Sequence, residues 1–387
     1  MVAQSGGPTV VINASLAGAI SEAQQSRRFD AILGSRNGIE GVLAGAFFDL
    51  TRLTSDRLAR LRVTPSAALG TSRHRPTDDE IVQLLDQLHT LDIRAFVPIG
   101  GNDTAETALR LGAAAANRGQ ELRVIAVPKT IDNDLPETDH CPGYGSIARY
   151  TALAVRDAAF DTRAMSQIYP VKIVEVMGRN AGWLTASGSL AFDDSLPRPI
   201  LCLPERPVSG FDELAELVTV AVERDGYAVL VIPETMRWSD GTPVGGATPE
   251  WVDAFGHAYY RGVGSTLARE LSRRIGNQAR YDKPGTIARM AMASASSVDL
   301  AEAEQVGREA VRCAIAGETG VMVTIQRASD QPYNACYGTA PLERIASVER
   351  RLPDDMIDPS GHDVTPRFRA WALPLLGDPL PEYEVLV

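Results

Sequence analysis

Short apolar runs alternate with longer helical stretches along most of this chain, and this alternation constrains the fold more than any other feature. Val-rich and Ile-rich runs bounded by Gly or Pro are typical of buried strands. They occur at Ala95–Gly100, Val124–Pro128, Val171–Met177, Ile200–Leu203, Tyr227–Pro233 and Gly320–Ile325. Apolar residues recur with helical spacing at Thr77–Leu91, Thr104–Arg118, Ser146–Asp161, Phe211–Arg224 and Leu300–Ala316. Strands and helices in this order form βαβ units, so we expect an α/β fold with mainly parallel sheets flanked by helices.

The length of the chain predicts two lobes, because 387 residues exceed what one hydrophobic core usually holds. We expect residues 1–138 and about 280–326 to form one lobe, and residues 139–279 to form the other. The stretch from Thr138 to Gly145 contains Pro and Gly and is the expected hinge. Residues 327–387 have several prolines and weak periodicity, so no placement is predicted for them. Few residues precede Gln4 in the first strand, and we expect the native start further upstream.

The composition of the chain argues against several classes of partner. A formal net charge of −11 disfavours a broad nucleic-acid-binding or anionic-membrane surface. There is no run of roughly 18 uninterrupted apolar residues, and the N-terminus lacks the basic and apolar regions of a secretory signal. We therefore expect a cytoplasmic protein that binds neither nucleic acid nor membrane. A small pocket of arginines can still hold an anion.

The cysteines and histidines give no sign of a metal site. The four cysteines have no C-x-x-C spacing, and the five histidines are isolated from one another. This pattern argues against both a zinc site and a disulfide framework. Cys202 lies in the apolar run Pro-Ile-Leu-Cys-Leu-Pro and is expected in the core.

The motif V-P-K-T-I-D-N-D, at residues 127–134, directly follows a predicted strand. In parallel sheets, ligands bind beyond the carboxyl ends of the strands. A helix cap would explain one aspartate, but not Lys129, Thr130, Asp132 and Asp134 together. A carboxylate beside a lysine in this position fits a general base next to a cation that stabilises an anion. The alternative is a solvated surface loop.

Two glycine-rich turns also follow predicted strands. The glycine pair in Ser5–Thr9 would let backbone N–H groups approach an anion at the positive end of the next helix. The glycines in Gly100–Thr104 could likewise cradle a phosphate, and Asn102 and Asp103 offer the oxygen ligands that Mg²⁺ prefers. An ordinary turn followed by an Asp or Thr helix cap remains the alternative.

Charged residues cluster at several further turns. Leu69–Arg75, Met177–Asn180 and Arg280–Arg289 each combine Arg with Gly, Ser or Pro, and Glu205 follows another predicted strand. Arg binds phosphate in a bidentate manner that Lys cannot reproduce. Any one of these clusters could be solvated surface charge, but their repeated position at strand ends or turns favours an anion-binding site.

Taken in order, these motifs resemble the phosphofructokinase family, and most closely its pyrophosphate-dependent branch. The matching elements are S-G-G-P, L-G-T-S-R, G-G-N-D, P-K-T-I-D-N-D, G-Y-G-S, V-E-V-M-G-R, P-E and R-(x)5-T-I-A-R. They extend from about Ala3 to Ile325, and the C-terminal segment is not matched. The resemblance implies a two-lobed fold with the active site between a phosphoryl-donor lobe and a sugar-phosphate lobe. It also implies reversible transfer from diphosphate to the 1-hydroxyl of fructose 6-phosphate, a reaction of glycolysis and gluconeogenesis.

The resemblance also implies roles for individual residues. Asp132 is the implied proton acceptor, and Lys129 would neutralise charge on the departing phosphate. The implied Mg²⁺ residues are Asn102 and Asp134, and the implied donor-binding residues are Gly6, Arg73 and Asp103. The implied sugar-binding residues are Thr130, Asp132, Met177, Gly178, Arg179 and Glu205. The implied sugar-phosphate pocket contains Arg280, Thr286 and Arg289, with one arginine supplied across a subunit interface of a homodimer or homotetramer.

Three positions depart from the family pattern. Asn102 stands where many members have a metal-binding aspartate, so Mg²⁺ would depend more on donor oxygens and on Asp132 or Asp134. Thr286 replaces a histidine that is common in ATP-using members. Pro170 replaces an arginine that reaches the neighbouring active site in bacterial ATP-using members, and the sequence does not identify its substitute.

The choice of donor depends on two positions where ATP-using members usually have glycine. The carboxylate of Asp103 would crowd and repel the α-phosphate of ATP, and Lys129 would neutralise a departing phosphate. Both favour pyrophosphate. The alternatives are an ATP-dependent enzyme, a kinase for another sugar phosphate such as sedoheptulose 7-phosphate, and a catalytically silent regulatory subunit. The intact K-T-I-D-N-D run argues against silence, and the absence of G-x-G-x-x-G after the first strand argues against a dehydrogenase.

Overall fold

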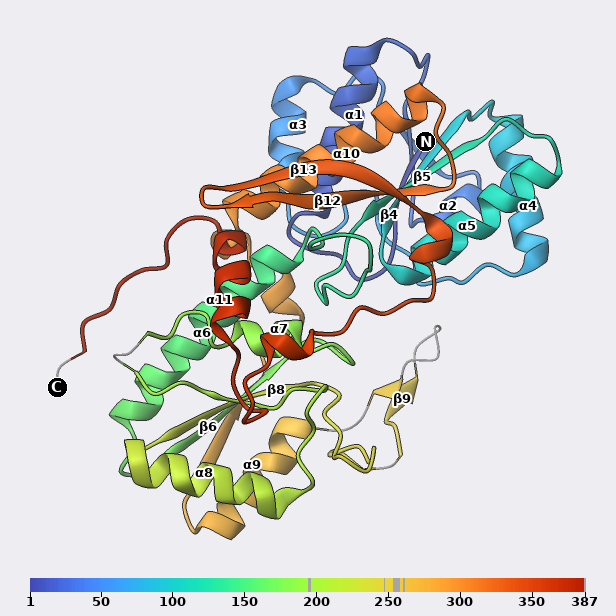
Figure 1. Ribbon diagram of the computed structural model, residues 1–387. Helices are drawn as coiled ribbons and strands as arrows, with labels where there is room; N and C mark the ends of the chain where they lie inside the picture. Colours follow the sequence, from blue (N-terminus) through green and yellow to red (C-terminus); the bar gives the residue numbers. More distant parts are fainter. Residues whose placement is uncertain (194–195, 247, 253–257, 260–261, 386–387) are drawn as a thin grey trace. The chain divides into compact units, whose positions relative to one another are not determined.

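The computed structural model describes residues 1–193, 196–246, 248–252, 258–259 and 262–385, and the chain forms two compact units (Figure 1). The first unit comprises residues 1–146 and 289–350, and the second comprises residues 147–288 and 351–387. The stretch from Thr138 to Gly145, which the sequence predicts as a hinge, therefore lies inside the first unit. The C-terminal segment is divided between the units, because the chain leaves the first unit after Arg350.

The first unit contains a seven-stranded sheet. Its strands are β1 (Val2–Gln4), β2 (Leu33–Ser35), β3 (Phe47–Asp49), β4 (Ala95–Gly100), β5 (Arg123–Pro128), β12 (Val321–Asp330) and β13 (Tyr333–Pro341). They lie in the order β13-β12-β5-β4-β1-β2-β3. The five inner strands are parallel, and the edge strands β3 and β13 run antiparallel to their neighbours. This sheet is the mainly parallel sheet that the alternation of strands and helices predicts.

Helices cover both faces of this sheet (Figure 1). One face packs against α1 (Ile12–Ser26), α3 (Ser55–Arg62) and α10 (Ser297–Ala316), and the other against α2 (Ile39–Leu43), α4 (Asp78–Thr90) and α5 (Asn102–Asn117). Successive strand residues point to opposite faces, so Val97 lies in the cluster with α1 and Phe96 in the cluster with α4. Strands buried on both sides read as continuous apolar runs, which is why β4 and β5 are predictable from sequence.

The second unit is built on a smaller parallel sheet. Its strands are β6 (Val171–Val176), β7 (Ile200–Leu201), β8 (Ala228–Pro233) and β11 (Ala279–Asp282), in the order β11-β6-β8-β7. Its helices include α7 (Trp183–Ser187), α8 (Phe211–Asp225), α9 (Val263–Ile275) and α11 (Pro366–Ala372). The core lies where β6 and β8 pack against α8 and α9. The long helix α6 (Tyr144–Ala164) begins at the end of the first unit and continues through the second.

The remaining elements are short. A two-stranded antiparallel pair consists of β9 (Trp251–Val252) and β10 (Ala258–Tyr259). The 3₁₀ helices are η1 (Gly285–Met290), η2 (Met292–Ser294), η3 (Leu342–Arg344), η4 (Asp354–Met356) and η5 (Leu373–Leu376). Several of them contain or follow the prolines that weaken the periodicity of the C-terminal segment.

The polar motifs lie where the sequence predicts them, beyond the carboxyl ends of parallel strands. Ser5 follows β1, Gly101 follows β4, Lys129 follows β5 and Met177 follows β6. One boundary differs, because α5 begins at Asn102 rather than Thr104. Asn102 and Asp103 therefore belong to the first helical turn rather than to a preceding loop. The strand ends thus position predicted site residues in each of the two units.

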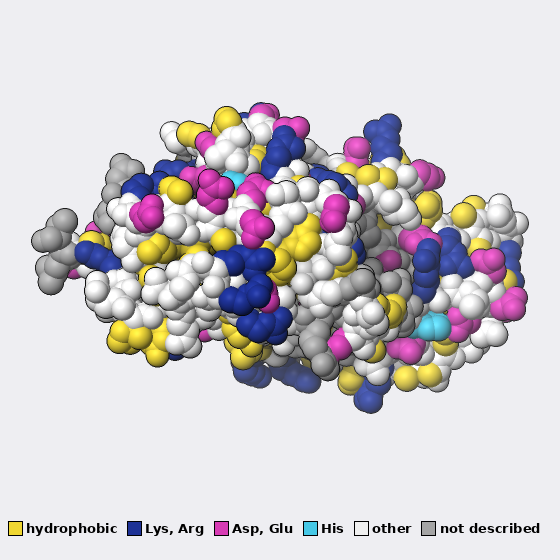
Figure 2. Space-filling view, turned by 90° about the horizontal axis from the view of Figure 1, so that it is seen from below, with side chains coloured by type: hydrophobic (Ala, Val, Ile, Leu, Met, Phe, Trp, Pro, Cys, Tyr) yellow, Lys and Arg dark blue, Asp and Glu magenta, His cyan; other side chains and the backbone are white. Residues whose placement is uncertain are grey.

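The surface and the cysteines agree with an ordinary globular chain. On the face seen in Figure 2, acidic and basic side chains are interspersed with apolar ones rather than forming an extended surface of one sign. None of the described helices is long and apolar enough to cross a bilayer. All four cysteines are free thiols, and Cys202 is buried as predicted.

Candidate active site

The loop after β5 places a buried lysine among backbone groups of two other loops. The backbone N–H of Lys129 donates to Gly100 O at 3.0 Å, which joins this loop to the turn after β4. Its ammonium Nζ donates to Gly7 O at 2.8 Å, which joins it to the turn after β1. The side chain is buried, with 3% of the residue exposed. A buried ammonium with a carbonyl partner is a preorganised donor for an anion.

The glycine pair after β1 leaves space beside that ammonium. A Cβ atom at Gly6 would lie 3.3 Å from Lys129 Nζ, and one at Gly7 would lie 2.7 Å from Arg289 Nη1. Gly6 has a φ of +74°, a conformation that L side chains rarely adopt. Its N–H donates to Ser72 O at 2.9 Å, so the turn is held against the segment that carries Arg73. Two cations therefore flank a backbone turn without side chains.

The surroundings of Lys129 lower its pKa to about 8. Burial is the largest cause, and the nearby Arg289 guanidinium adds to it. The carboxylates of Asp132 and Asp134 act in the opposite direction, while Arg73 lowers the pKa slightly further. Four other charged side chains from the predicted set thus lie close enough to Lys129 to affect its charge. At neutral pH most of the lysine remains protonated, and it can pair with a strong anion.

A hydrogen-bonded turn orients the two aspartates. Thr130 Oγ1 donates to Asp134 Oδ1 at 3.0 Å and accepts from the backbone N–H of Asp132 at 3.1 Å. Asn133 between the aspartates is fully buried and has a φ of +55°, which Asn tolerates better than most residues. Its Oδ1 accepts from the backbone N–H of Cys141 at 2.9 Å. The turn is therefore tied down on both sides of Asp132.

The turn after β4 carries the amide oxygen of Asn102 and the carboxylate of Asp103, and it lies beside the backbone of Lys129. A Cβ at Gly101, the N-cap of α5, would lie 3.5 Å from Lys129 O. Asn102 Oδ1 is buried and has no hydrogen-bond partner among the described residues. Asp103 follows in the first turn of α5, where the helix dipole stabilises a carboxylate. The hydrogen bond to Glu106 is the main cause of the raised pKa of Arg75, and the charge of Asp103 raises that pKa further.

The side-chain oxygens of Asn102 and Asp134 are of the chemical type that Mg²⁺ prefers. In the described ranges, no group of three or more His, Cys, Asp or Glu side chains is placed to hold a metal. Asn102 instead offers a buried amide oxygen that has no hydrogen-bond partner in the described part of the chain. Asp134 offers a buried carboxylate, of which Oδ1 accepts from Thr130. Mg²⁺ usually keeps few protein ligands and takes the rest from phosphates and water. The donor set therefore suits Mg²⁺ bound together with a phosphate ester or anhydride.

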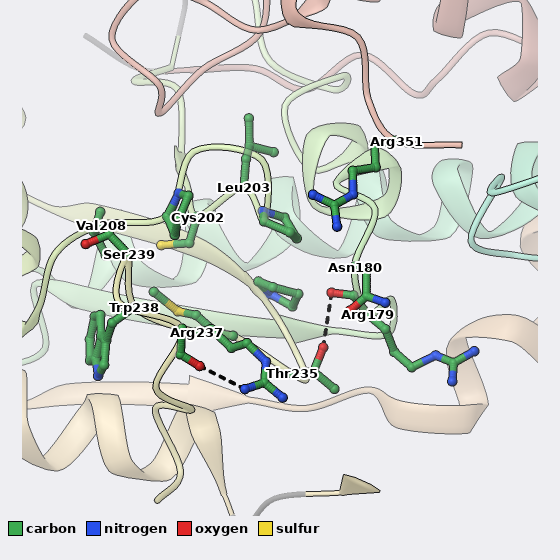
Figure 3. Close-up of a pocket in the computed structure, with 15 residues that line it drawn as sticks. Arg179, Asn180, Cys202, Leu203, Val208, Thr235, Arg237, Trp238, Ser239 and Arg351 are labelled. Carbon is green, nitrogen blue, oxygen red and sulfur yellow. Dashed lines mark hydrogen bonds between the residues drawn. The ribbon is translucent and has the colours of Figure 1, made fainter. Parts of the chain in front are cut away.

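In the second unit, the turn after β6 leads into a pocket (Figure 3). Gly178 has a φ of +105°, which turns the chain sharply between Met177 and Arg179. Arg179 O accepts from Thr235 Oγ1 at 3.1 Å, so this turn is joined to the loop after β8. The pocket encloses about 230 Å³. Apolar side chains of the loops after β7 and β8 line it together with Arg179, Arg237 and Arg351.

Glu205 is fixed at one carboxylate oxygen and open at the other. Its Oε1 accepts from the backbone N–H groups of Gly182 and Leu352, each at 2.9 Å. Its Oε2 is buried and has no hydrogen-bond partner among the described residues. A Cβ at Gly182 would overlap this oxygen, so the glycine leaves room for it. Burial raises the pKa of Glu205, although the two backbone bonds oppose the rise. An oriented, unpartnered acceptor of this kind suits a hydroxyl group.

The residues predicted for the sugar phosphate are divided between the two units. Arg280 lies 4.9 Å from the ring centroid of Tyr169 and 4.0 Å from Asp161. Thr286 is exposed in η1. Met177 lines a separate small apolar cavity with residues of α6, β6 and η1. Of the residues predicted to contact the sugar phosphate, Arg179 lines the pocket of Figure 3, whereas Glu205, Arg280 and Thr286 do not. Arg289 belongs to the first unit, where it lies beside Gly7.

Sequence reasoning missed three residues that shape these half-sites. Gly182 makes room for Glu205, and Arg351 lines the pocket with Arg179. Arg350 donates to three backbone carbonyls of the loop that follows Asp132. Gly182 is signalled only weakly, by the glycines of its turn. The two arginines follow a segment without a motif, so their contacts were not predictable.

The chain is similar to known proteins over its whole length. A family model described as Phosphofructokinase matches residues 1–314. A pyrophosphate--fructose 6-phosphate 1-phosphotransferase of Xanthomonas campestris pv. campestris (strain B100) is 40% identical over 408 residues, covering 100% of this chain and 95% of that protein. The crystal structure of a pyrophosphate-dependent phosphofructokinase from Nitrosospira multiformis has a TM-score of 0.89 at 34% identity, covering 99% of this chain and 93% of that one. An ATP-dependent 6-phosphofructokinase 2 of Streptomyces coelicolor is 31% identical over 338 residues, covering 85% of this chain and 89% of that protein.

Proposed function

The chain belongs to the phosphofructokinase family, and from this premise we propose that it transfers a phosphoryl group from pyrophosphate to the 1-hydroxyl of fructose 6-phosphate. The products are fructose 1,6-bisphosphate and phosphate. Full-length similarity to proteins named for this reaction supports the proposal. The single observation that carries the choice of chemistry is the buried Lys129 ammonium, held by Gly7 O beside Arg289 and the two aspartates of the loop after β5.

The donor half-site is proposed to comprise the glycine turn and its two cations. Gly6 and Gly7 leave backbone exposed to the donor, while Lys129 and Arg289 face the same space. Arg73 lies close enough to influence the charge of Lys129. Phosphoryl transfer depends mainly on positioning and on charge stabilisation, so a compact set of cations is what the reaction requires.

Asp132 is proposed to accept the proton of the sugar's 1-hydroxyl. The hydroxyl oxygen forms a bond to the terminal phosphorus of pyrophosphate, and the bond from that phosphorus to the bridging oxygen breaks. The proton moves to the Asp132 carboxylate, and the phosphate that leaves takes the electron pair. The Lys129 ammonium then neutralises charge on the departing phosphate. The Thr130 hydrogen bonds, to the backbone N–H of Asp132 and the carboxylate of Asp134, fix the turn that carries the acceptor carboxylate.

Asp103 is proposed to select pyrophosphate over ATP. Its carboxylate lies in the first turn of α5, directly after the glycine turn that precedes it. The α-phosphate of ATP would bring a further negative charge to this region, and like charges in a poorly solvated site repel strongly. Pyrophosphate has no α-phosphate, so it avoids the penalty.

Mg²⁺ is the proposed cofactor, held by the Asn102 amide oxygen and the Asp134 carboxylate together with the donor. When bound, it would neutralise charge on the donor oxygens. The buried, unpartnered Asn102 Oδ1 supports this assignment. Because an amide is a neutral ligand, the ion is expected to bind weakly without pyrophosphate.

The acceptor half-site is proposed to lie in the second unit. Glu205 Oε2 would accept from a sugar hydroxyl. The turn of Met177, Gly178 and Arg179 would contact the sugar, and Arg179 of this turn lines the pocket of Figure 3. Arg280 and Thr286 remain proposed contacts of the 6-phosphate. The reaction requires the donor and acceptor half-sites to act on one pair of substrates. The proposed assembly state is a homo-oligomer.

A stoichiometric ³¹P NMR measurement tests the proposal. The protein is mixed with Mg²⁺, pyrophosphate and fructose 6-phosphate, without any nucleotide, and the Asp132→Asn variant serves as a matched control. We expect pyrophosphate to disappear while phosphate and a new sugar 1-phosphate resonance grow in equal amounts. Phosphate without sugar bisphosphate would indicate hydrolysis, and no change at all would indicate another substrate or a silent protein. Either result would overturn the proposal.

A further inference from the structure

One guanidinium holds the loop that follows the proposed proton acceptor. Arg350 donates to Asn133 O from Nε at 3.2 Å and from Nη2 at 3.0 Å. Its Nη1 donates to Asp139 O at 2.9 Å and also to Thr138 O. The backbone N–H of Arg350 donates to Asp134 O at 2.7 Å. A residue more than two hundred positions away in sequence therefore bridges both arms of the 133–139 loop.

The position of these bonds matters more than their number. Asn133 stands between Asp132 and Asp134 in a left-handed conformation, which needs support from its surroundings. Arg350 binds its carbonyl, while Cys141 binds its side chain. The peptide units next to both aspartates are thus fixed by partners outside the loop.

Burying this cation has a cost. Burial lowers the pKa of Arg350, and Cys141, Asp139, Asp134 and Tyr144 oppose the effect. A packing role alone would be filled at lower cost by an apolar side chain of similar size. The planar fork of Arg instead matches several carbonyls at once, which a lysine cannot do.

We propose that Arg350 is a positioning residue that holds Asp132 and Asp134 in the geometry needed for transfer. The proposal rests on the proposed function for the identity of the reaction. It assigns a role to the C-terminal segment, which has no recognisable motif. Because a displacement of about 1 Å in a catalytic group costs about 100-fold in rate, loosening this loop should lower kcat. Substrate binding in the second unit should change little.

The test compares Arg350→Lys and Arg350→Ala with variants at Arg123. Arg123 also donates to a backbone carbonyl in the first unit, that of Ala314 at 3.0 Å, but it lies at the opposite end of β5. We expect Arg350→Lys to lower kcat about 10- to 100-fold, with KM for fructose 6-phosphate within about twofold of wild type. Added guanidinium should restore part of the kcat of Arg350→Ala. Arg123→Lys should keep kcat, and guanidinium should not affect Arg123→Ala.

Hydrogen exchange gives a second readout that needs no activity. Without substrates, Arg350→Lys should exchange faster than wild type in peptides that cover residues 129–141, while peptides from β6 and β8 stay unchanged. A wild-type protein inactive with pyrophosphate would overturn the proposed function, and the exchange result would still decide whether Arg350 holds this loop. Unchanged loop exchange, wild-type kcat in Arg350→Lys, or equal losses at Arg123 would each overturn the positioning role. If Arg350→Ala does not fold, Arg350→Lys decides the question alone.

Discussion

Replacing Lys129 by Met should weaken catalysis and strengthen the fold. Met keeps an unbranched apolar side chain in the buried position but removes the ammonium that faces the donor space. The wild-type pKa is lowered from 10.5 to about 8, and each pK unit corresponds to about 1.4 kcal/mol, so the buried charge costs about 3 kcal/mol. The lost bond to Gly7 O offsets about 1 kcal/mol of the gain. We therefore expect Lys129→Met to be about 2 kcal/mol more stable at pH 7.

The pH dependence isolates the contribution of this group. A lysine whose folded pKa lies below its unfolded value binds fewer protons in the folded state between about pH 8 and 10.5. Wild-type stability therefore rises with pH in that window. Between pH 7 and 9 the rise from Lys129 is about 1 kcal/mol, and Lys129→Met should lack it. Taking the difference between the two proteins cancels the other titrating groups.

Urea unfolding at pH 7, 8 and 9 measures these differences, and initial rates with pyrophosphate measure catalysis. We expect kcat of Lys129→Met to fall about 10²- to 10³-fold, as is typical when a charge-stabilising group is lost. Lys172→Met is the matched control, because Lys172 is also buried but pairs with Asp282 at 2.7 Å. That variant should lose stability. If Lys129→Met is less stable than wild type, or shows the same pH dependence, the electrostatic reasoning is refuted.

Three further predictions concern other residues. Asp132→Ser should lower kcat by about 10²- to 10⁴-fold with little change in KM for fructose 6-phosphate, and steady-state kinetics showing an unchanged kcat would remove the proton-acceptor role. Glu205→Gln should raise that KM about tenfold while kcat stays near wild type, and an equal loss in both parameters would contradict a binding role. His140 lies between Glu302 at 2.6 Å and Asp139 at 2.8 Å, and its pKa is raised to about 9. Its contribution to stability is therefore present below about pH 6.5 and lost as the pH rises through about 9, so urea unfolding should lose this pH dependence in His140→Gln.

The sequence predicts the longer buried strands and the polar loops because their signals are local. β4 and β8 are buried along their whole length, and β5 is buried after Arg123, so all three appear as apolar runs. The short or half-exposed strands β2, β3, β11 and β13 carry no such run. Their positions depend on pairing with distant strands, which periodicity does not reveal.

The candidate site divides in the same way. Lys129 and the aspartates of its loop are recognisable from one short motif, and the structure places them together. Arg289 is predicted for the sugar phosphate, and the closeness of its Nη1 to Gly7 in the first unit is a contact that the motif does not indicate. The role of Arg350 arises from bonds to carbonyls more than two hundred residues earlier, and backbone carbonyls leave no trace in a sequence. Long-range contacts to the main chain are thus the feature of the candidate site that sequence motifs do not predict.

The measurement that tests the central claim most directly compares donors. Initial rates of fructose 1,6-bisphosphate formation should be measured for wild type and Asp103→Gly, with pyrophosphate or ATP at several concentrations, in a coupled aldolase assay. We predict that wild type has a far higher kcat/KM for pyrophosphate than for ATP. Asp103→Gly should raise kcat/KM for ATP and so lower the ratio of the two values. Wild-type activity with ATP and none with pyrophosphate would contradict the assignment of donor and of the roles of Asp103 and Lys129.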